Sequence, residues 1–150
     1  MRRAETVTSW TLRRTSPGGD IVLITPGGAR LTLPAADHRA TVWASALERA
    51  KGIGAPVYLA FDDQGLVFEL IVEQRRVVQG MRSEPGAQAD AVTFRMAPSI
   101  YHLMHDSTDY PRIHGLLSRA RDTKEEIWVA SLPGRAIIVD ARADTEPGAR

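Results

Sequence analysis

Cysteine is absent from the 150-residue chain. Its absence excludes disulfides, thiolate metal sites and cysteine nucleophiles, and it fits a reducing compartment, so we expect a cytoplasmic protein. The chain also lacks any apolar run near the roughly 20 residues that a membrane helix needs, and no apolar segment follows the arginines at its start. We therefore expect neither membrane insertion nor secretion.

An excess of either charge is lacking too, because 19 basic residues face 18 acidic ones for a net charge of +1. Such a balance gives no global field that would attract nucleic acid, so any nucleic-acid site would have to be a local patch. Aromatic residues make up only 6% of the chain, whereas 43% of its residues are hydrophobic. This composition is typical of a globular protein.

Short apolar runs rich in β-branched and aromatic residues fill most of the chain, and turn signals such as "SPGGD", "TPGG", "DDQG" and "LPG" separate them. Runs of this kind predict β-strands joined by tight turns. In the first half we expect strands at 7–14, 21–25, 29–33, 56–61 and 66–72. In the second half we expect them at 75–82, 91–95, 99–104, 126–131 and 135–141.

Two segments instead show helical periodicity. The first helix is expected at 38–51, with Asp37 as its N-cap and Gly52 just past its end. The second is expected at 111–122, with Asp109 as its cap and Pro111 in its first turn. The two apolar stripes consist of Val42, Trp43, Ala46, Leu47 and Ala50, and of Ile113, Leu116, Leu117 and Ala120.

The two halves also match each other. A shift of 70 aligns residues 7–63 with 77–133 without a gap, and eight of these 57 pairs are identical, against about four by chance. The hydrophobic pattern argues more strongly than this count, because both helices and the strands after them coincide. A one-residue deletion after the next hairpin would place Gly65 on Gly134. We interpret the pattern as an internal duplication.

The sequence thus predicts a β-rich α+β protein with two units, 1–72 and 73–141, and a disordered tail at 142–150. Each unit runs strand, strand, strand, helix, strand, strand. This element order resembles that of the OB-fold, a small Greek-key barrel, over nearly the whole chain, without any family motif. A single domain with pseudo-twofold symmetry fits the same order.

Aromatic and basic residues on the predicted strands form one candidate binding surface, because bases stack on aromatic rings while arginines hold the phosphates. Acidic residues interleave with them, as on an ordinary solvated face. The candidates are Trp10, Arg13, Arg82, Phe94, Arg95 and Tyr101.

Histidines cluster in "YHLMHDSTDYPRIH", where His102, His105 and His114 are candidate metal ligands. Residues 102 and 105 of a continuing strand point to opposite faces, which argues for structural or surface histidines instead. No catalytic motif accompanies them, so we expect no cofactor and have no positive support for an enzyme.

Three functional hypotheses remain open. The first is a non-catalytic protein-interaction or assembly module, in which exposed sheet edges pair with a protein partner or with a second copy of the chain. The second is a single-stranded nucleic-acid-binding protein, which the OB-like resemblance implies at the level of fold. The third is a metal-dependent enzyme that uses the histidine cluster.

Overall fold

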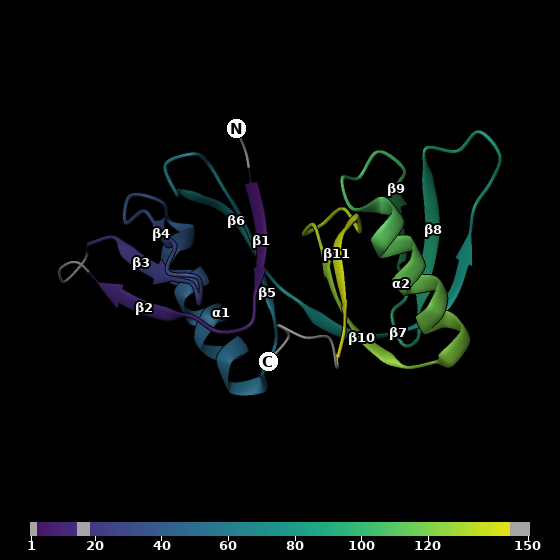
Figure 1. Cartoon of the computed structure of the whole chain (residues 1–150), viewed down its shortest axis with the longest axis horizontal. Coiled ribbons are helices and arrows are strands. Elements are labelled where there is room, and N and C mark those ends of the chain that lie inside the picture. The colour runs from purple at the N-terminus through teal and green to yellow at the C-terminus, as the bar shows by residue number, and fades with distance from the viewer. Residues whose placement is uncertain (1–2, 15–18, 145–150) are drawn as a thin grey trace. The chain divides into compact units, whose positions relative to one another are not determined.

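The computed structural model describes residues 3–14 and 19–144 (Figure 1). Contacts within the chain divide it into two compact units, the first ending at Val72 and the second beginning at Glu73. Among the described residues, neither helix has the length and apolar character needed to cross a bilayer. Each unit consists of antiparallel strands and one helix, so the expectation of a β-rich α+β chain is confirmed.

The first unit contains two three-stranded sheets, with strand orders β1-β5-β6 and β2-β3-β4. A single parallel bridge joins β4 to the start of β6, where the backbone N–H of Thr32 donates to the carbonyl of Gly65 at 2.7 Å. Its elements are β1 (Arg3–Val7), β2 (Thr11–Arg14), β3 (Ile21–Ile24), β4 (Arg30–Leu33), α1 (Arg39–Ile53), β5 (Val57–Phe61) and β6 (Val67–Val72).

The second unit contains one sheet of five strands in the order β11-β10-β7-β8-β9. The backbone N–H of His102, in β9, donates to the carbonyl of Ala136 at 2.8 Å, next to a parallel bridge between His102 and Ile137. Its elements are β7 (Gln74–Arg82), β8 (Ala89–Phe94), β9 (Ile100–Met104), α2 (Tyr110–Thr123), β10 (Glu126–Ser131) and β11 (Ile138–Ala143).

The prediction of one strand over 7–14 is wrong, since two strands, β1 and β2, flank a break at residues 8–10. The reason lies in their partners, because β1 pairs with β5 whereas β2 pairs with β3. In the second unit β7 is continuous and makes both kinds of pairing, with β10 along its first part and with β8 along its second.

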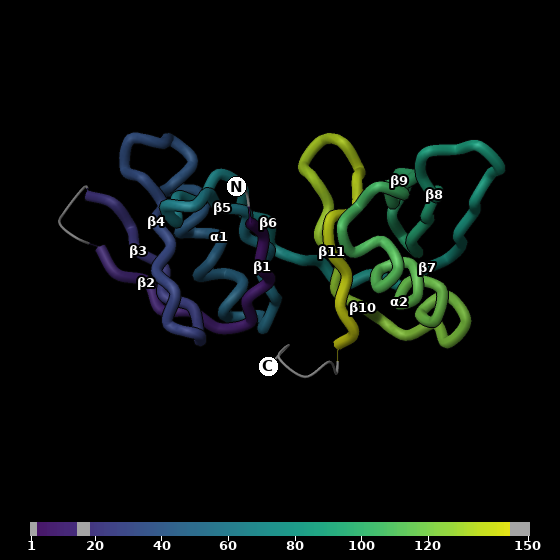
Figure 2. The backbone as a smooth tube through the Cα atoms, turned by 45° about the horizontal axis from the view of Figure 1, so that its top comes forward, coloured from purple at the N-terminus to yellow at the C-terminus, as the bar shows by residue number. Residues whose placement is uncertain are grey.

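The helix in the second unit matches its predicted stripe, and all four stripe residues are buried. It packs against β7 and β11 (Figure 2). The core beneath it includes Phe94 and Leu103. In α1, by contrast, Val42 is 64% exposed, and the helix continues past Gly52 to a left-handed C-cap at Gly54. Its N-cap is His38, and Asp37 instead accepts the backbone N–H of Arg39 at 2.9 Å.

The hairpins before β6 and β11 differ by one residue, but in the direction opposite to our prediction. Thr32 and His102, 70 positions apart, donate to the carbonyls of Gly65 and Ala136, which are 71 apart. Both carbonyl residues have a positive φ, 76° for Gly65 and 53° for Ala136. The second hairpin therefore carries one extra residue, and Gly65 corresponds to Ala136 rather than to Gly134.

The last strand, β11, extends to Ala143 and so includes the first two residues of the predicted tail. Residues 145–150 of that tail lie outside the described residues.

Candidate functional site

Two of the three aromatic members of the predicted binding surface are buried. Trp10 is 5% exposed, and Phe94 is 1% exposed within the core of the second unit. Tyr101 packs against the same core, with its ring edge-to-face with Phe94 at a centroid distance of 5.1 Å. A stacking platform needs an exposed ring face. Trp10 and Phe94 therefore offer no such face, whereas Tyr101 is only partly buried, and nucleic-acid binding at this surface stays a prediction.

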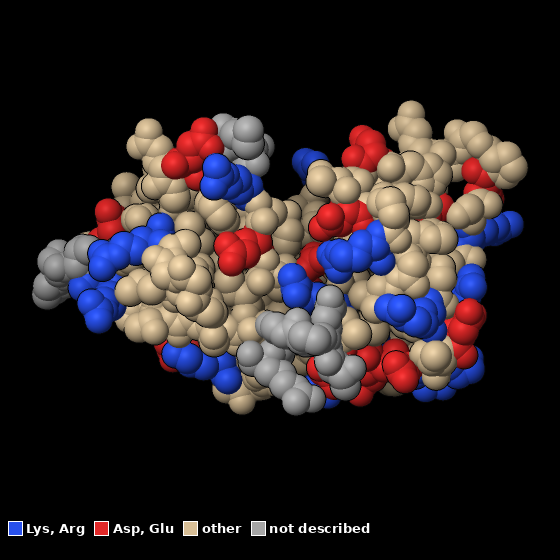
Figure 3. All heavy atoms as spheres, in the orientation of Figure 1, with Lys and Arg blue, Asp and Glu red and all other residues tan. Residues whose placement is uncertain are grey.

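The basic members of that surface are exposed, as predicted for solvated positions. Arg13 lies on β2, Arg82 ends β7, and Arg95 directly follows β8. Arg82 faces Glu84 across 3.5 Å in an exposed ion pair. Lysine and arginine are interspersed with acidic residues over the face shown in Figure 3. Such mixing gives little sustained attraction for a phosphate backbone.

The three histidines of the predicted metal site are not assembled around one point. His102 lies exposed on β9, whereas His105 and His114 both face Asp90, at Nε2–O distances of 2.8 and 3.9 Å. Within residues 3–14 and 19–144, no group of three or more histidine, cysteine, aspartate or glutamate side chains is placed to hold a metal ion. The geometry thus gives no support to the metal-site prediction.

Asp90 itself is the centre of a polar cluster that the sequence did not reveal. Its side chain is 1% exposed, on β8. Its carboxylate accepts hydrogen bonds from the Ser83 hydroxyl at 2.5 Å and from the Tyr110 hydroxyl at 2.6 Å, in addition to the His105 contact. The rings of Tyr110 and His114 are neighbours, with centroids 5.4 Å apart. Side chains from the helix therefore fill the space above Asp90.

These contacts shift two titrations. Burial raises the pKa of Asp90, but hydrogen bonds from Ser83, Tyr110 and His105 outweigh it and leave the pKa below its ordinary value. The same hydrogen bond to Asp90 raises the pKa of Tyr110 to about 12. The carboxylate is accordingly ionised and fully engaged at neutral pH, as a structural acceptor is.

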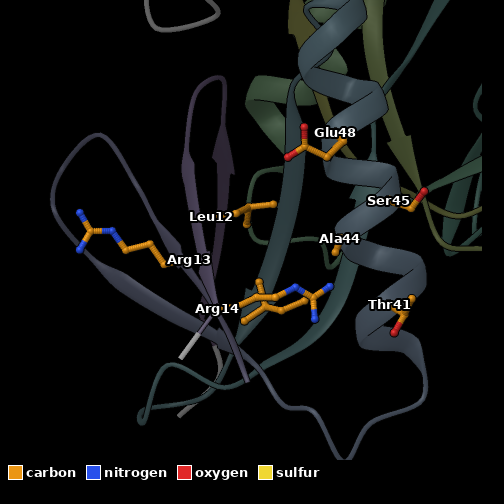
Figure 4. Close-up of a pocket in the computed structure, with 8 residues that line it drawn as sticks. Leu12, Arg13, Arg14, Thr41, Ala44, Ser45 and Glu48 are labelled. Carbon is orange, nitrogen blue, oxygen red and sulfur yellow. The ribbon is translucent and has the colours of Figure 1, made fainter. Parts of the chain in front are cut away.

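The first unit contains an open pocket of about 410 Å³ between β2, β3 and α1 (Figure 4). In the close-up, the Arg14 guanidinium points toward α1 and the Glu48 carboxylate points back toward β2, whereas Arg13 extends away from the helix. The lining residues are Leu12, Arg13, Arg14, Ile21, Thr41, Ala44, Ser45 and Glu48. The pocket therefore combines apolar side chains with two arginines from β2, Arg13 and Arg14, and the acidic Glu48 from α1.

This pocket and the Asp90 cluster lie at corresponding places in the two units. Ile21 pairs with Leu33 across the β3–β4 ladder, as Asp90 pairs with Leu103 across the β8–β9 ladder. On the helices, Ala44 precedes His114 by 70 positions. The position of the His114 ring in the second unit is thus matched in the first by an alanine that lines the open pocket.

The arginines that are tied to the fold have carboxylate partners. Arg39 forms an ion pair with Asp37 at 2.9 Å, and Arg112 pairs with Asp140 at 2.5 Å. Arg13, Arg14 and Glu48 form no ion pair with any other residue that the structure describes. The charges of the pocket are therefore not used by the described part of the fold.

Comparison with known proteins adds no functional assignment: the chain matches no protein-family model, and no curated protein or solved structure is significantly similar to it.

Proposed function

We propose that each unit is an OB-like barrel and that the two units are copies of one ancestral unit. The order of strand pairing supports this proposal. In both units the first strand region pairs with the second and fourth, the second with the third, and the fourth with the fifth. A parallel bridge then joins the third strand to the start of the fifth. A ring closed in this order is that of a five-stranded Greek-key barrel.

Hydrogen exchange tests the closure of each ring. We expect the backbone amides of Thr32 and His102 to exchange at least about 100-fold more slowly than the amide of Asp106, because each donates a bridging hydrogen bond. The measurement is amide exchange followed by NMR. Fast exchange at both bridging amides would show that the sheets are open and would overturn the barrel.

On this scaffold, we propose that the chain is a non-catalytic binding module that acts by protein–protein interaction, with the pocket of the first unit as its docking place. The observation that carries this proposal is the absence of described partners for Arg14 and Glu48 beside an open, partly apolar pocket. A partner carboxylate placed against Arg14 would form a charge-assisted hydrogen bond, which is stronger than a neutral one. Leu12, Ile21 and Ala44 supply apolar surface beside it, as in interface cores.

Titration of the labelled protein with charged peptides tests the proposal. An acidic peptide, Ac-GEEGEEG-NH2, is expected to shift the backbone amide signals of residues 12–14 and 41–48, whereas Ac-GKKGKKG-NH2 is not. Arg14→Glu should weaken the acidic-peptide binding at least about tenfold, because it reverses the charge in the pocket. Arg82→Glu reverses a charge on the second unit and serves as the matched control.

The competing hypotheses give different outcomes in the same experiment. Shifts caused by a ten-nucleotide single-stranded oligo-dT, but not by the acidic peptide, would replace protein interaction by nucleic-acid binding. If the amide signals of residues 12–14 and 41–48 change when the protein is diluted without any ligand, the pocket is an interface between two copies of the chain. If the acidic peptide shifts the Arg14→Glu variant as strongly as the original chain, the pocket is not the docking place.

A further inference from the structure

The pocket of the first unit corresponds to a position in the second unit that side-chain rings occupy. These rings indicate what kind of group the pocket accommodates. In the second unit this place lies between β7, β8 and α2, and the rings of Tyr110 and His114 occupy it above Asp90. In the first unit it is the pocket between β2, β3 and α1. Of the helix positions 70 residues earlier, Ala44 matches His114 and lines the pocket, whereas Ala40 matches Tyr110 and is buried. The ring that α2 supplies at His114 is therefore missing from the pocket beside α1.

We infer that the docking segment of the partner places an aromatic side chain in this pocket, next to a carboxylate that pairs with Arg14; this inference rests on the proposed function. The pocket volume of about 410 Å³ is within the range of sites that bind small groups, so one ring fits where a folded domain does not. The apolar side chains of Leu12, Ile21 and Ala44, which line the pocket, match a ring face.

The charges of the pocket set the neighbours of that ring. Arg14 reaches toward α1 along one side of the pocket, and Glu48 reaches toward β2 along another (Figure 4). A lysine beside the ring would meet the guanidinium of Arg14, and like charges so placed are unfavourable. An aspartate on the Arg14 side of the ring pairs with the guanidinium and leaves the ring against the apolar side chains. The recognised feature is therefore an aromatic residue with an acidic neighbour on the Arg14 side.

Three peptides test this inference: Ac-Asp-Tyr-Asp-NH2, Ac-Asp-Leu-Asp-NH2 and Ac-Lys-Tyr-Lys-NH2. We expect the first to bind about fivefold more tightly than the second, since aromatic contacts exceed those of an aliphatic side chain of similar size. The third should not shift the signals of residues 12–14 and 41–48. Binding constants come from NMR titration.

Two variants on the same helix provide a matched pair. Ala44→Phe places a ring inside the pocket and should abolish the preference for the tyrosine peptide. Val42→Phe adds the same ring at a position that is 64% exposed and should leave the preference unchanged. Should Ala44→Phe fail to fold, nuclear Overhauser effects between the tyrosine ring protons and the methyl groups of Leu12 or Ile21 in the original chain decide the question.

The outcomes separate the two proposals. Equal binding of the tyrosine and leucine peptides, or an absence of those ring–methyl effects, would overturn the aromatic inference while leaving an acidic docking site. If neither aspartate peptide shifts the pocket signals, both the aromatic inference and the docking site fail.

Discussion

Replacing Asp90 by alanine is expected to lower the free energy of unfolding by about 3 kcal/mol, because a buried acceptor of several hydrogen bonds is lost. The Asp90 side chain is 1% exposed, and Ser83, Tyr110 and His105 all contact its carboxylate. Removing it deprives all three donors of their shared acceptor and leaves a void at a buried position. Guanidinium denaturation followed by circular dichroism measures the loss. Asp106→Ala, at an exposed position of the same unit, is the control and should change stability by less than about 0.5 kcal/mol.

The same carboxylate makes stability depend on pH. Its pKa in the folded chain lies below the ordinary value of 3.8, so protons bind the unfolded chain first as the solution is acidified. The stabilising contribution of Asp90 is therefore complete well above the ordinary pKa of 3.8 and is lost as the pH falls through the folded-state pKa. Asp90→Asn should be less stable at pH 7 and lose less stability below pH 4. An unchanged acid slope in this variant would contradict the assignment.

Part of the acid slope should survive in Asp90→Asn. Hydrogen bonds from the side chain and the backbone of Arg39 lower the pKa of Asp37 to about 2, so this second carboxylate also loses a contribution on acidification. Its effect belongs to the first unit, at the start of α1.

Replacing Gly65 by alanine is expected to cost about 2 kcal/mol or more. Gly65 has a φ of 76°, where L-residues with a Cβ pay about 1–2 kcal/mol. A Cβ there would also lie 2.9 Å from the carbonyl oxygen of Arg30, a backbone atom that cannot move alone. The displaced segment carries the carbonyl that accepts the N–H of Thr32, so the bridge between β4 and β6 should weaken.

Gly134→Ala is the matched control for this effect. Gly134 has a nearly identical φ of 74°, but a Cβ there meets nothing within 4 Å. It should therefore show the conformational cost alone, and the difference between the two variants measures the close approach to Arg30. Equal losses in thermal or chemical denaturation would show that this contact has no energetic consequence.

The hydrophobic period allowed most elements to be predicted from the sequence. The four apolar positions of α2 recur at helical spacing and are all buried, because a stripe of that width has only one way to face a core. In α1 the predicted stripe included Val42, but that residue is exposed and Ala40 is buried instead. Tertiary packing decides which edge of a broad apolar stripe is buried, and the sequence pattern alone does not show which edge that is.

The candidate site was less accessible to sequence reasoning. Phe94 alternates correctly for a strand, but alternation does not say which of two faces is the core, and Phe94 lies on the buried one. Trp10 lies in the break between β1 and β2 and is also buried. Asp90 gave no signal because a buried carboxylate is recognisable only through its donors, which come from positions 83, 105 and 110. The pocket depends on small residues of α1, and an alanine in a helical sequence does not indicate whether a pocket lies beside it.

The helix of the first unit has two adjacent stripes with separate duties. One stripe is buried and consists of Ala40, Trp43, Leu47 and Ala50. The other lines the pocket and consists of Thr41, Ala44, Ser45 and Glu48. Mutations in the second stripe alter the shape and charge of the pocket while the residues that hold the helix in place stay constant. Under the proposed docking function, the residues that contact the partner could change during evolution or by design while the residues that anchor the helix stay the same.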